Sequence, residues 1–315
     1  TAYWDDGTGE QLENDLAGAA RNEEMTEVKK HKLYKKVPLQ KCYDITGKAP
    51  VKTKWIDINK GDAEKPEYRS RLVAMEIATG KRDDLFAATP PLEAIKVLLS
   101  MAVTEGIGFN PGNRKNGMKL DFIDVRRAYF HAKARRPVFV ELPAEDATEG
   151  MCGELQQSMY GTRDAAQNWE REYQEMAASL GFTKGVASPC TFYHADRDLR
   201  MVVHGDDFTI LGWEKDLDWL RQQISQRWEV KCRGRLGPSD RDDKSIRLLN
   251  RVIEWSSTGI KYEPDQRHAE IIVKMLQLNQ GNSVGSPGTK DANFNPEEIE
   301  ESLSITDQSR FRAMA

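Results

Sequence analysis

The sequence predicts an α+β fold, on the strength of three observations. Apolar residues recur at helical spacing in several stretches, while other short stretches are continuously apolar and end at turn residues. These two kinds of stretch do not alternate with the regular strand–helix–strand order of a parallel sheet. The 315 residues, of which 39% are hydrophobic and 30% charged, can also bury a sizeable core in more than one subdomain.

The first part of the chain contains two predicted helices and a predicted hairpin. A helix is expected over about 15–33, where a thin apolar stripe repeats at helical spacing. Strand-like runs at 51–58 and around 71–74 flank a polar turn, which is a hairpin pattern. A second helix is expected over 92–104, because it follows two prolines and ends before Gly106.

The second part contains both short apolar strands and amphipathic helices. Strands are expected at 122–125, 138–142, 201–204 and 208–211. Helices are expected at 165–180, 213–228 and 267–278. Gly181 follows the first of these helices and is its expected C-terminal cap.

Composition excludes several classes of protein. No run approaches the roughly 18 apolar residues that a membrane span needs, and the acidic, aromatic start is not typical of a signal peptide. The start also lacks Met, so we expect a piece of a longer protein. Four separated cysteines predict reduced thiols and neither a zinc site nor a disulfide framework. A net charge of −4 argues against non-specific coating of nucleic acid, although basic clusters occur.

The pair Asp206-Asp207 is the strongest candidate for a functional site. Other Asp-Asp pairs, such as Asp5-Asp6, lie in polar stretches that are typical of solvated loops. Asp206 and Asp207 instead lie between two apolar strands, where adjacent like charges are costly unless a cation neutralises them. Carboxylate oxygens suit Mg²⁺, or Mn²⁺ in its place.

Asp124 is the predicted third ligand because it lies inside another apolar strand. Asp121 precedes it by an odd number of positions, so on an extended strand the two side chains point to opposite faces and only Asp124 should join the site. If the strands are neighbours, three carboxylates converge and can hold two metal ions about 3.5–4 Å apart. Each aspartate taken alone fits a turn or a strand-end cap equally well.

Motifs around these aspartates resemble the reverse transcriptases of copia-type LTR retrotransposons. Residues 124–131, DVRRAYFH, resemble the first catalytic motif of that family, D-V-x-x-A-[FY]. Residues 159–169, MYGTRDAAQNW, are similar to L-Y-G-L-K-Q-A-P-R-x-W, and residues 203–207, VHGDD, stand in the place of Y-V-D-D. Further similar segments flank these in the same order, at 52–55, 68–74, 248–251 and 284–287, so the resemblance covers nearly the whole chain.

The resemblance implies a right-hand polymerase fold with fingers, palm and the start of a thumb. The implied boundaries are a helical N-terminal extension at 1–40, fingers at 41–119, the first catalytic palm strand at 120–136, a return to the fingers at 137–162, palm at 163–255 and a thumb or connection segment at 256–315.

The resemblance also assigns roles to residues of the site. Asp124, Asp206 and Asp207 would bind two metal ions, with the Val125 carbonyl as a further ligand. Tyr129 would be a steric gate that excludes ribonucleotides by a clash with the 2′-hydroxyl. A packed strand aromatic is the alternative for Tyr129.

Basic residues would bind the triphosphate. Arg71, with Lys60 and Arg69, would clamp the phosphates and offset charge in the transition state. Solvated surface charges are the alternative. Lys231 would be a general acid toward pyrophosphate, and a plain basic surface residue is the alternative for it.

The remaining implied contacts lie around the nucleotide and the primer. Tyr160 and Gly161 would border the nucleotide pocket, Arg163 would face phosphate or template, and His204 would touch the primer end. The family has a tyrosine where His204 stands, a hydrophobic residue at Gly205, a lysine at Arg163 and a proline at position 166, which is alanine here. None of these departures removes a metal ligand.

The expected activity is RNA-directed DNA polymerisation, a nucleotidyl transfer. The partners would be an RNA or DNA template with its primer, and dNTPs, with no membrane. The resemblance implies a cytoplasmic retroelement particle, with the nucleus as a further location. A decayed retroelement remnant that binds nucleic acid or a partner without catalysis is the alternative, and a two-metal nuclease is a third hypothesis that leaves Tyr129 unused.

Overall fold

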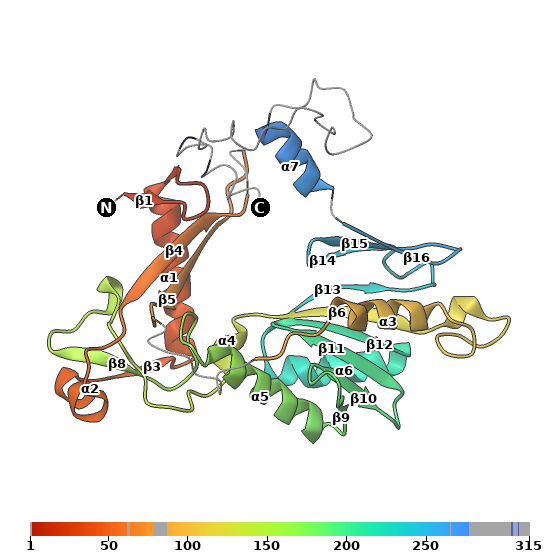
Figure 1. Cartoon of the computed structure of the whole chain (residues 1–315), viewed down its shortest axis with the longest axis horizontal. Coiled ribbons are helices and arrows are strands. Elements are labelled where there is room, and N and C mark those ends of the chain that lie inside the picture. The colour runs from red at the N-terminus through yellow and green to blue at the C-terminus, as the bar shows by residue number, and fades with distance from the viewer. Residues whose placement is uncertain are drawn as a thin grey trace, which may run out of the picture. The chain divides into compact units, whose positions relative to one another are not determined.

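The computed structural model describes residues 2–61, 64–77, 87–264 and 266–276, together with Ser304 and Gln308 (Figure 1). The segment 284–287 and the end of the helix expected to reach 278 lie outside these residues. The chain divides into two compact units, one of Thr1–Ile246 with Trp255–Ile260 and the other of Arg247–Glu254 with Lys261–Ala315. All of the site residues proposed from the sequence belong to the first unit.

A six-stranded antiparallel sheet is the centre of the first unit (Figure 1). Its strands, in spatial order, are β13 (Val230–Leu236), β6 (Lys119–Val125), β12 (Asp207–Gly212), β11 (Leu199–His204), β10 (Thr191–His194) and β9 (Thr183–Lys184). Because β6 lies between two strands, its backbone is paired on both edges, and nearly all of its residues are buried.

Helices cover this sheet on both faces. Side chains of α5 (Ala165–Ser179) and α6 (Glu214–Arg227) pack on one face, and α3 (Leu92–Ala102) contacts β6, β11 and β12. Trp169 of α5 is 1% exposed and packs against Phe208 of β12 in the core. Since Phe208 packs in the core beneath α5 and α6, Asp207 next to it must point to the opposite face of the sheet.

The rest of the first unit is built around α1 (Asn14–Lys30) and two small sheets. The hairpin of β4 (Thr53–Asn59) and β5 (Tyr68–Ala74) lies against α1 (Figure 1). The other sheet pairs β3 (Tyr34–Pro38) and β7 (Phe139–Val140) with β8 (Met151–Leu155). Their shared core contains Leu33, Leu72 and Phe130.

The remaining described elements are short. They are β1 (Tyr3–Trp4), β2 (Gln11–Leu12), α2 (Leu39–Thr46), the 3₁₀ turns η1 (Arg114–Asn116) and η2 (Ala144–Asp146), α4 (Ala128–His131), β14 (Ser245–Leu248), β15 (Arg251–Trp255), β16 (Ile260–Pro264) and α7 (Arg267–Met275). Among the described residues, no helix is long and apolar enough to cross a membrane. Three of the four cysteines are buried, the exception being Cys232, and all are free thiols.

The mixed α+β class and the long elements predicted from the sequence are confirmed. The helices expected at 15–33, 92–104, 165–180 and 213–228 are present as α1, α3, α5 and α6, each within a few residues of its expected limits. The expected hairpin pairs Thr53 with Ala74 through Asn59 with Tyr68. The strand expected at 138–142 is shorter, because only Phe139 and Val140 pair with β8.

Candidate active site

Asp124 and Asp207 lie directly opposite each other on neighbouring strands. The antiparallel register of β6 and β12 pairs Asp207 with Asp124 and Phe208 with Ile123. Asp206 lies in the turn that precedes β12, and its carbonyl accepts a hydrogen bond from the Val125 N–H at 2.9 Å. The fold therefore brings the first and last predicted aspartates together, although they are far apart in the sequence.

The turn that carries Asp206 is a two-residue hairpin connection between His204 and Asp207, which pair across it. Gly205 has φ +62° at the first central position of this turn, which favours glycine because an L side chain is strained there. The Trp169 indole N–H donates to the Gly205 carbonyl at 2.8 Å. Glycine at position 205, where the family has a hydrophobic residue, therefore fits the conformation of this turn. The hydrogen bond from buried Trp169 helps to fix the position of the turn.

Arg233 neutralises part of the carboxylate charge. This β13 residue places Nη2 at 2.5 Å from Asp124 Oδ2 and 2.9 Å from Asp207 Oδ1. The second contact is an ion pair without the geometry of a hydrogen bond, so the buried Oδ1 of Asp207 has no hydrogen-bond partner among the described residues. Burial raises the pKa of Asp207 to about 6, and it also raises the pKa of Asp206, with the charge of Asp124 contributing to both shifts.

These aspartates fit a bound cation in charge and in donor type. A buried carboxylate oxygen without a hydrogen bond is costly, and a divalent ion would satisfy it. Within the described ranges, however, no three carboxylate, histidine or cysteine side chains converge closely enough to form a ready-made metal cage. Asp124 and Asp207 instead converge on the guanidinium group of Arg233.

Asp121, on the same strand, is not part of this constellation. Its carboxylate is fully buried and accepts from Nε of Arg235 at 2.6 Å and from Nη2 of Arg221 at 2.9 Å. These partners lie on β13 and α6, so Asp121 points to the face of the sheet covered by α6, and Asp124 points to the opposite face. The prediction that the two side chains point to opposite faces is confirmed.

A polar cavity of about 720 Å³ lies beside the aspartates. Seven basic residues line it: Lys60, Arg69, Arg71, Arg126, Arg127, Lys231 and Arg233. Asp124, Val125 and Asp206 line it as well. Burial lowers the pKa values of Lys60 and Arg69, and the neighbouring charge of Arg71 lowers both further. Positive charges so crowded favour binding of an anion.

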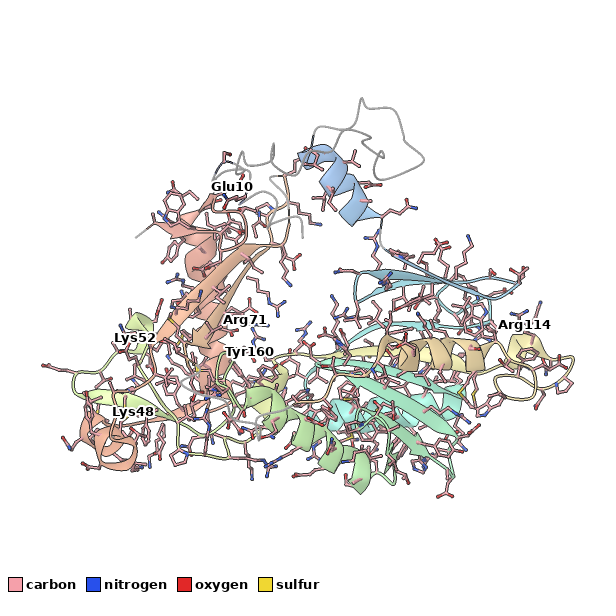
Figure 2. All side chains as sticks on the ribbon, in the orientation of Figure 1. Glu10, Lys48, Lys52, Arg71, Arg114 and Tyr160 are labelled. Carbon is pink, nitrogen blue, oxygen red and sulfur yellow. The ribbon has the colours of Figure 1, made fainter. Side chains whose placement is uncertain are left out.

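Arg71 is held at the wall of this cavity by two contacts. Its Nη1 donates to Glu24 Oε2 at 2.9 Å, and its guanidinium carbon lies 5.5 Å from the ring centre of Tyr160. Figure 2 shows Arg71 and Tyr160 close together in the first unit. Arg71 is therefore a fixed part of the cavity wall, and its ion pair with Glu24 distinguishes it from a freely solvated charge.

Tyr129 and Gly161 adjoin Tyr160. The rings of Tyr129 and Tyr160 have their centres 4.7 Å apart, and burial raises the pKa of Tyr160 to about 12. Burial also raises the pKa of Tyr129, with a further contribution from the charge of Asp206. Gly161 has φ +84°, and a Cβ there would clash with the Ala74 carbonyl oxygen.

The other three predicted site residues lie around this centre. Lys231 of β13 pairs in register with Asp124 and lines the cavity. The Arg163 N–H donates to Glu76 Oε2 at 2.8 Å, and Arg163 is not among the residues that line the cavity. His204, at the end of β11, pairs in register with Asp207.

Three site residues, Arg233, Glu24 and Arg127, were not predicted from the sequence. Arg233 lies on β13 between two other basic residues, Lys231 and Arg235, so its charge alone does not distinguish it as a site residue. Glu24 is a helix residue with charged neighbours, so nothing in its local pattern indicates that it is 1% exposed. Arg127 does belong to the motif that begins at Asp124, and this motif was the signal that could have found it.

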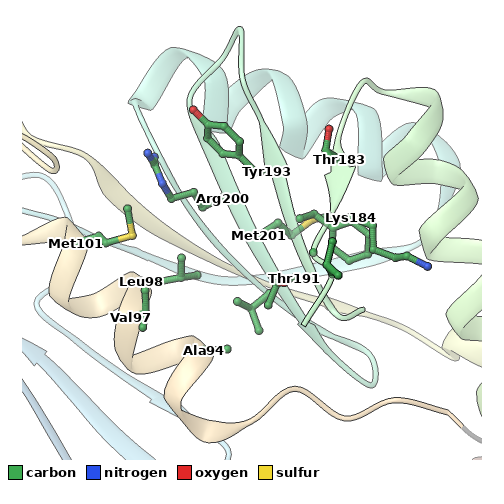
Figure 3. A pocket seen from close by; sticks show the side chains of 14 residues that line it. Ala94, Val97, Leu98, Met101, Thr183, Lys184, Thr191, Tyr193, Arg200 and Met201 are labelled. Atoms are coloured by element: carbon green, nitrogen blue, oxygen red, sulfur yellow. The ribbon is translucent and has the colours of Figure 1, made fainter. Parts of the chain in front are cut away.

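A second cavity, of about 480 Å³, lies between α3 and strands β9 to β11 (Figure 3). Its lining is largely apolar, with Leu98 and Met101 from the helix and Phe192 and Val202 from the sheet. It contains none of the aspartates, so its chemistry differs from that of the polar cavity.

Comparison with known proteins identifies the family. Residues 40–237 match the family described as reverse transcriptase (RNA-dependent DNA polymerase). The chain is 24% identical over 281 residues to the "Retrovirus-related Pol polyprotein from transposon TNT 1-94" of Nicotiana tabacum, across 85% of this chain and 19% of the polyprotein.

Among solved structures, the foamy viral protease-reverse transcriptase in complex with double-stranded DNA is similar over 90% of this chain and 40% of its own. The TM-score is 0.41 and the sequence identity 10%. The match to the family covers more than half of the chain and confirms the resemblance to copia-type enzymes. The chain belongs to the reverse transcriptase (RNA-dependent DNA polymerase) family.

Proposed function

We propose that this chain extends a primer on an RNA or DNA template by transferring nucleotides from dNTPs to the primer 3′-hydroxyl. One observation carries the proposal: Asp124 lies directly opposite Asp207, with Asp206 in the adjoining turn, beside a cavity lined with lysine and arginine. Acidic groups next to basic groups suit a triphosphate that carries a divalent cation.

Asp124, Asp206 and Asp207 would hold two Mg²⁺ ions, or Mn²⁺ in their place, with the Val125 carbonyl as a further ligand. Such ions, when bound, activate the attacking hydroxyl and stabilise the leaving phosphate oxygen. The support from this chain is the raised pKa of Asp207 and its buried oxygen without a hydrogen bond, since both reflect a local need for positive charge.

The basic residues would act on the nucleotide itself. Arg71, Lys60 and Arg69 would bind the triphosphate, because guanidinium and ammonium groups form charge-assisted hydrogen bonds with phosphate oxygens. Lys231, in register with Asp124, would hold a proton for the pyrophosphate. Tyr129, packed on Tyr160, would exclude the ribose 2′-hydroxyl by its bulk.

Single-nucleotide primer extension with Mg²⁺ tests this function. Asp206→Asn should lower the rate by about a thousandfold or more, because the amide keeps the shape of the turn but loses a charge on which cation binding depends. Asp196→Asn, in the exposed turn between β10 and β11, is the matched control and should keep wild-type activity. Extension that survives Asp206→Asn would contradict the proposal.

The same assay separates the other hypotheses. A catalytically decayed remnant would bind primer–template without incorporating any nucleotide in Mg²⁺ or Mn²⁺, and a nuclease would shorten the primer. The fit of Gly205 to its turn removes one reason to regard the altered motif as decay.

A further inference from the structure

Glu24 of α1 is a buried carboxylate that contacts two arginines of the polar cavity wall. Its side chain is 1% exposed. Oε2 accepts from Nη1 of Arg71 at 2.9 Å and from Nε of Arg127 at 3.0 Å, while the buried Oε1 has no hydrogen-bond partner among the described residues. A carboxylate buried in this way is stable only through its paired charges, so its position and those of both guanidinium groups depend on one another.

The two arginines lead to different parts of the nucleotide site. Arg71 contacts the Tyr160 ring and lines the cavity. Arg127 lies immediately before α4, which carries Tyr129, and has the left-handed φ of +50° that is uncommon for a residue with a side chain. The Glu24 carboxylate therefore contacts both Arg71, which is expected to bind phosphate, and Arg127, whose backbone leads into the helix of Tyr129.

The charge of Glu24 offsets part of the positive charge in the cavity wall. Lys60, Arg69 and Arg71 line the same cavity, so their charges repel one another, and the charge of Arg71 lowers the pKa values of the other two. Arg71 forms its ion pair with Glu24, whereas Arg127 also pairs with Glu23 and Glu27. Without the charge of Glu24, repulsion would favour movement of the Arg71 guanidinium away from its neighbours.

We propose that Glu24 is a positioning residue for nucleotide binding, which holds Arg71 against Tyr160 and Arg127 at the start of α4. The inference rests on the proposed function and deepens it. Because α1 precedes the family-matched residues 40–237, a helix outside the matched segment would complete the nucleotide site.

The test is Glu24→Gln in the full chain, assayed by single-nucleotide extension over a range of dNTP concentrations. The amide keeps the size of the side chain but loses its charge, so the KM for dNTP should rise by about tenfold while kcat changes by less than about threefold. Asp15→Asn is the matched control. Asp15 is an exposed carboxylate near the start of the same helix and is not among the residues that line the cavity, so the KM of this variant should stay near the wild-type value.

A second readout needs no chemistry. Binding of dNTP to the complex with a dideoxy-terminated primer should weaken in Glu24→Gln by the same factor as the KM rises. Equal KM and Kd values in the Glu24 and Asp15 variants would overturn the inference. Primer extension by the wild type tests the proposed function separately. If the wild type binds dNTP but does not extend the primer, the Kd values of the variants still test the role of Glu24. Failure of the wild type to bind any dNTP would overturn both.

A folding defect can be separated from a positioning defect. If Glu24→Gln does not fold, the double variant Glu24→Gln with Arg127→Gln replaces the buried ion pair by two amides that can hydrogen-bond, while Arg71 still lacks its carboxylate. A folded double variant with the dNTP affinity of Arg127→Gln alone would refute the role of Glu24, and one that binds dNTP about tenfold more weakly than Arg127→Gln alone would support it.

Discussion

Burial controls how single ionisable side chains behave in this molecule, and His131 of α4 shows the consequence for stability. Its Nε2 lies 3.1 Å from the Arg126 carbonyl, its ring centre is 4.8 Å from that of His31, and it also contacts Trp228. Burial, together with the neighbouring His31, lowers the pKa of His131 from 6.5 to about 4. The folded state therefore favours the neutral imidazole.

The sign of the pH dependence follows from this depressed pKa. The contribution of His131 to stability is fully present above pH 6.5 and is lost as pH falls through about 4. The charges of His31 and Lys30 would repel the His131 imidazolium, and the charge of Glu229 would attract it. We expect the free energy of unfolding to fall by about 1 kcal/mol between pH 7 and pH 5 because of this group, discounted for partial exposure.

Urea unfolding at several pH values measures this effect. His131→Phe removes the titrating group and should flatten the acid side of the stability profile relative to wild type. The proton NMR shift of the His131 imidazole should titrate well below pH 6.5 in the folded wild type. An ordinary imidazole titration, or equal profiles for the two proteins, would contradict the prediction.

Tyr129 provides the second prediction at this scale. Its ring packs on Tyr160 with centres 4.7 Å apart, and burial together with the charge of Asp206 raises the pKa of its phenol. Tyr129→Ala should let the chain incorporate ribonucleotides about tenfold or more better relative to dNTPs, because the bulk that opposes the 2′-hydroxyl is gone. Competition between dNTP and rNTP in primer extension measures the ratio. Tyr129→Phe keeps the bulk and should keep wild-type discrimination.

At the scale of elements, the segment after β8 joins the β4–β5 hairpin through a tight backbone contact. The Ala74 N–H donates to the Tyr160 carbonyl at 2.7 Å, and Gly161 follows with φ +84°. Gly161→Ala should lower the free energy of unfolding by at least about 2 kcal/mol, since it adds left-handed strain and a clash with the Ala74 carbonyl.

A matched glycine separates strain from clash. Gly47, at the end of α2, has φ +65° and open space where a methyl group would be added, so Gly47→Ala should cost only about 1 kcal/mol. Urea denaturation of both variants gives the comparison. Equal losses of unfolding free energy in the two variants would mean that the backbone around Gly161 moves to accommodate the methyl group. The contact with Ala74 would then not fix the position of Tyr160.

The elements differ in how far the sequence predicts them. The helix α5 is predictable because Trp169, Tyr173 and Met176 repeat at helical spacing and are all buried. The strand β13 is not, because its central residues are mostly charged or glycine and it becomes a strand through pairing with β6. The two-residue strands β7 and β9 also depend on their partners, since two residues carry no periodicity.

The candidate site divides in the same way. The sequence predicts Asp124 and Asp206 as members of one site, because charges inside apolar stretches are visible locally. It does not predict the ion pairs that fix the site, because these depend on tertiary structure. Arg233 reaches Asp124 only through the pairing of β13 with β6, and Glu24 reaches Arg71 only through packing of α1 on β5.

At the scale of the whole molecule, charge is separated: the chain carries −4 overall, yet basic residues predominate in the polar cavity. Net repulsion from a nucleic-acid backbone should therefore be overcome locally, through phosphate contacts that release counterions. Affinity for primer–template should fall steeply with salt. The slope of log K against log [salt] should be about −0.9 for each duplex phosphate neutralised.

Arg126→Gln tests which arginines make those contacts. Arg126 lines the cavity and pairs with Glu229 at 3.0 Å, while Arg135 is absent from the cavity lining and pairs with Glu175 at 2.9 Å, so the two arginines differ mainly in location. Arg126→Gln should make the slope of log K against log [salt] shallower by about 0.9, and Arg135→Gln should leave this slope unchanged. Fluorescence anisotropy of a labelled primer–template at several salt concentrations measures the slope. Equal slopes for the two variants would mean that the phosphate backbone does not contact Arg126. A wild-type slope near zero would mean that nucleic acid does not bind this cavity through its charge.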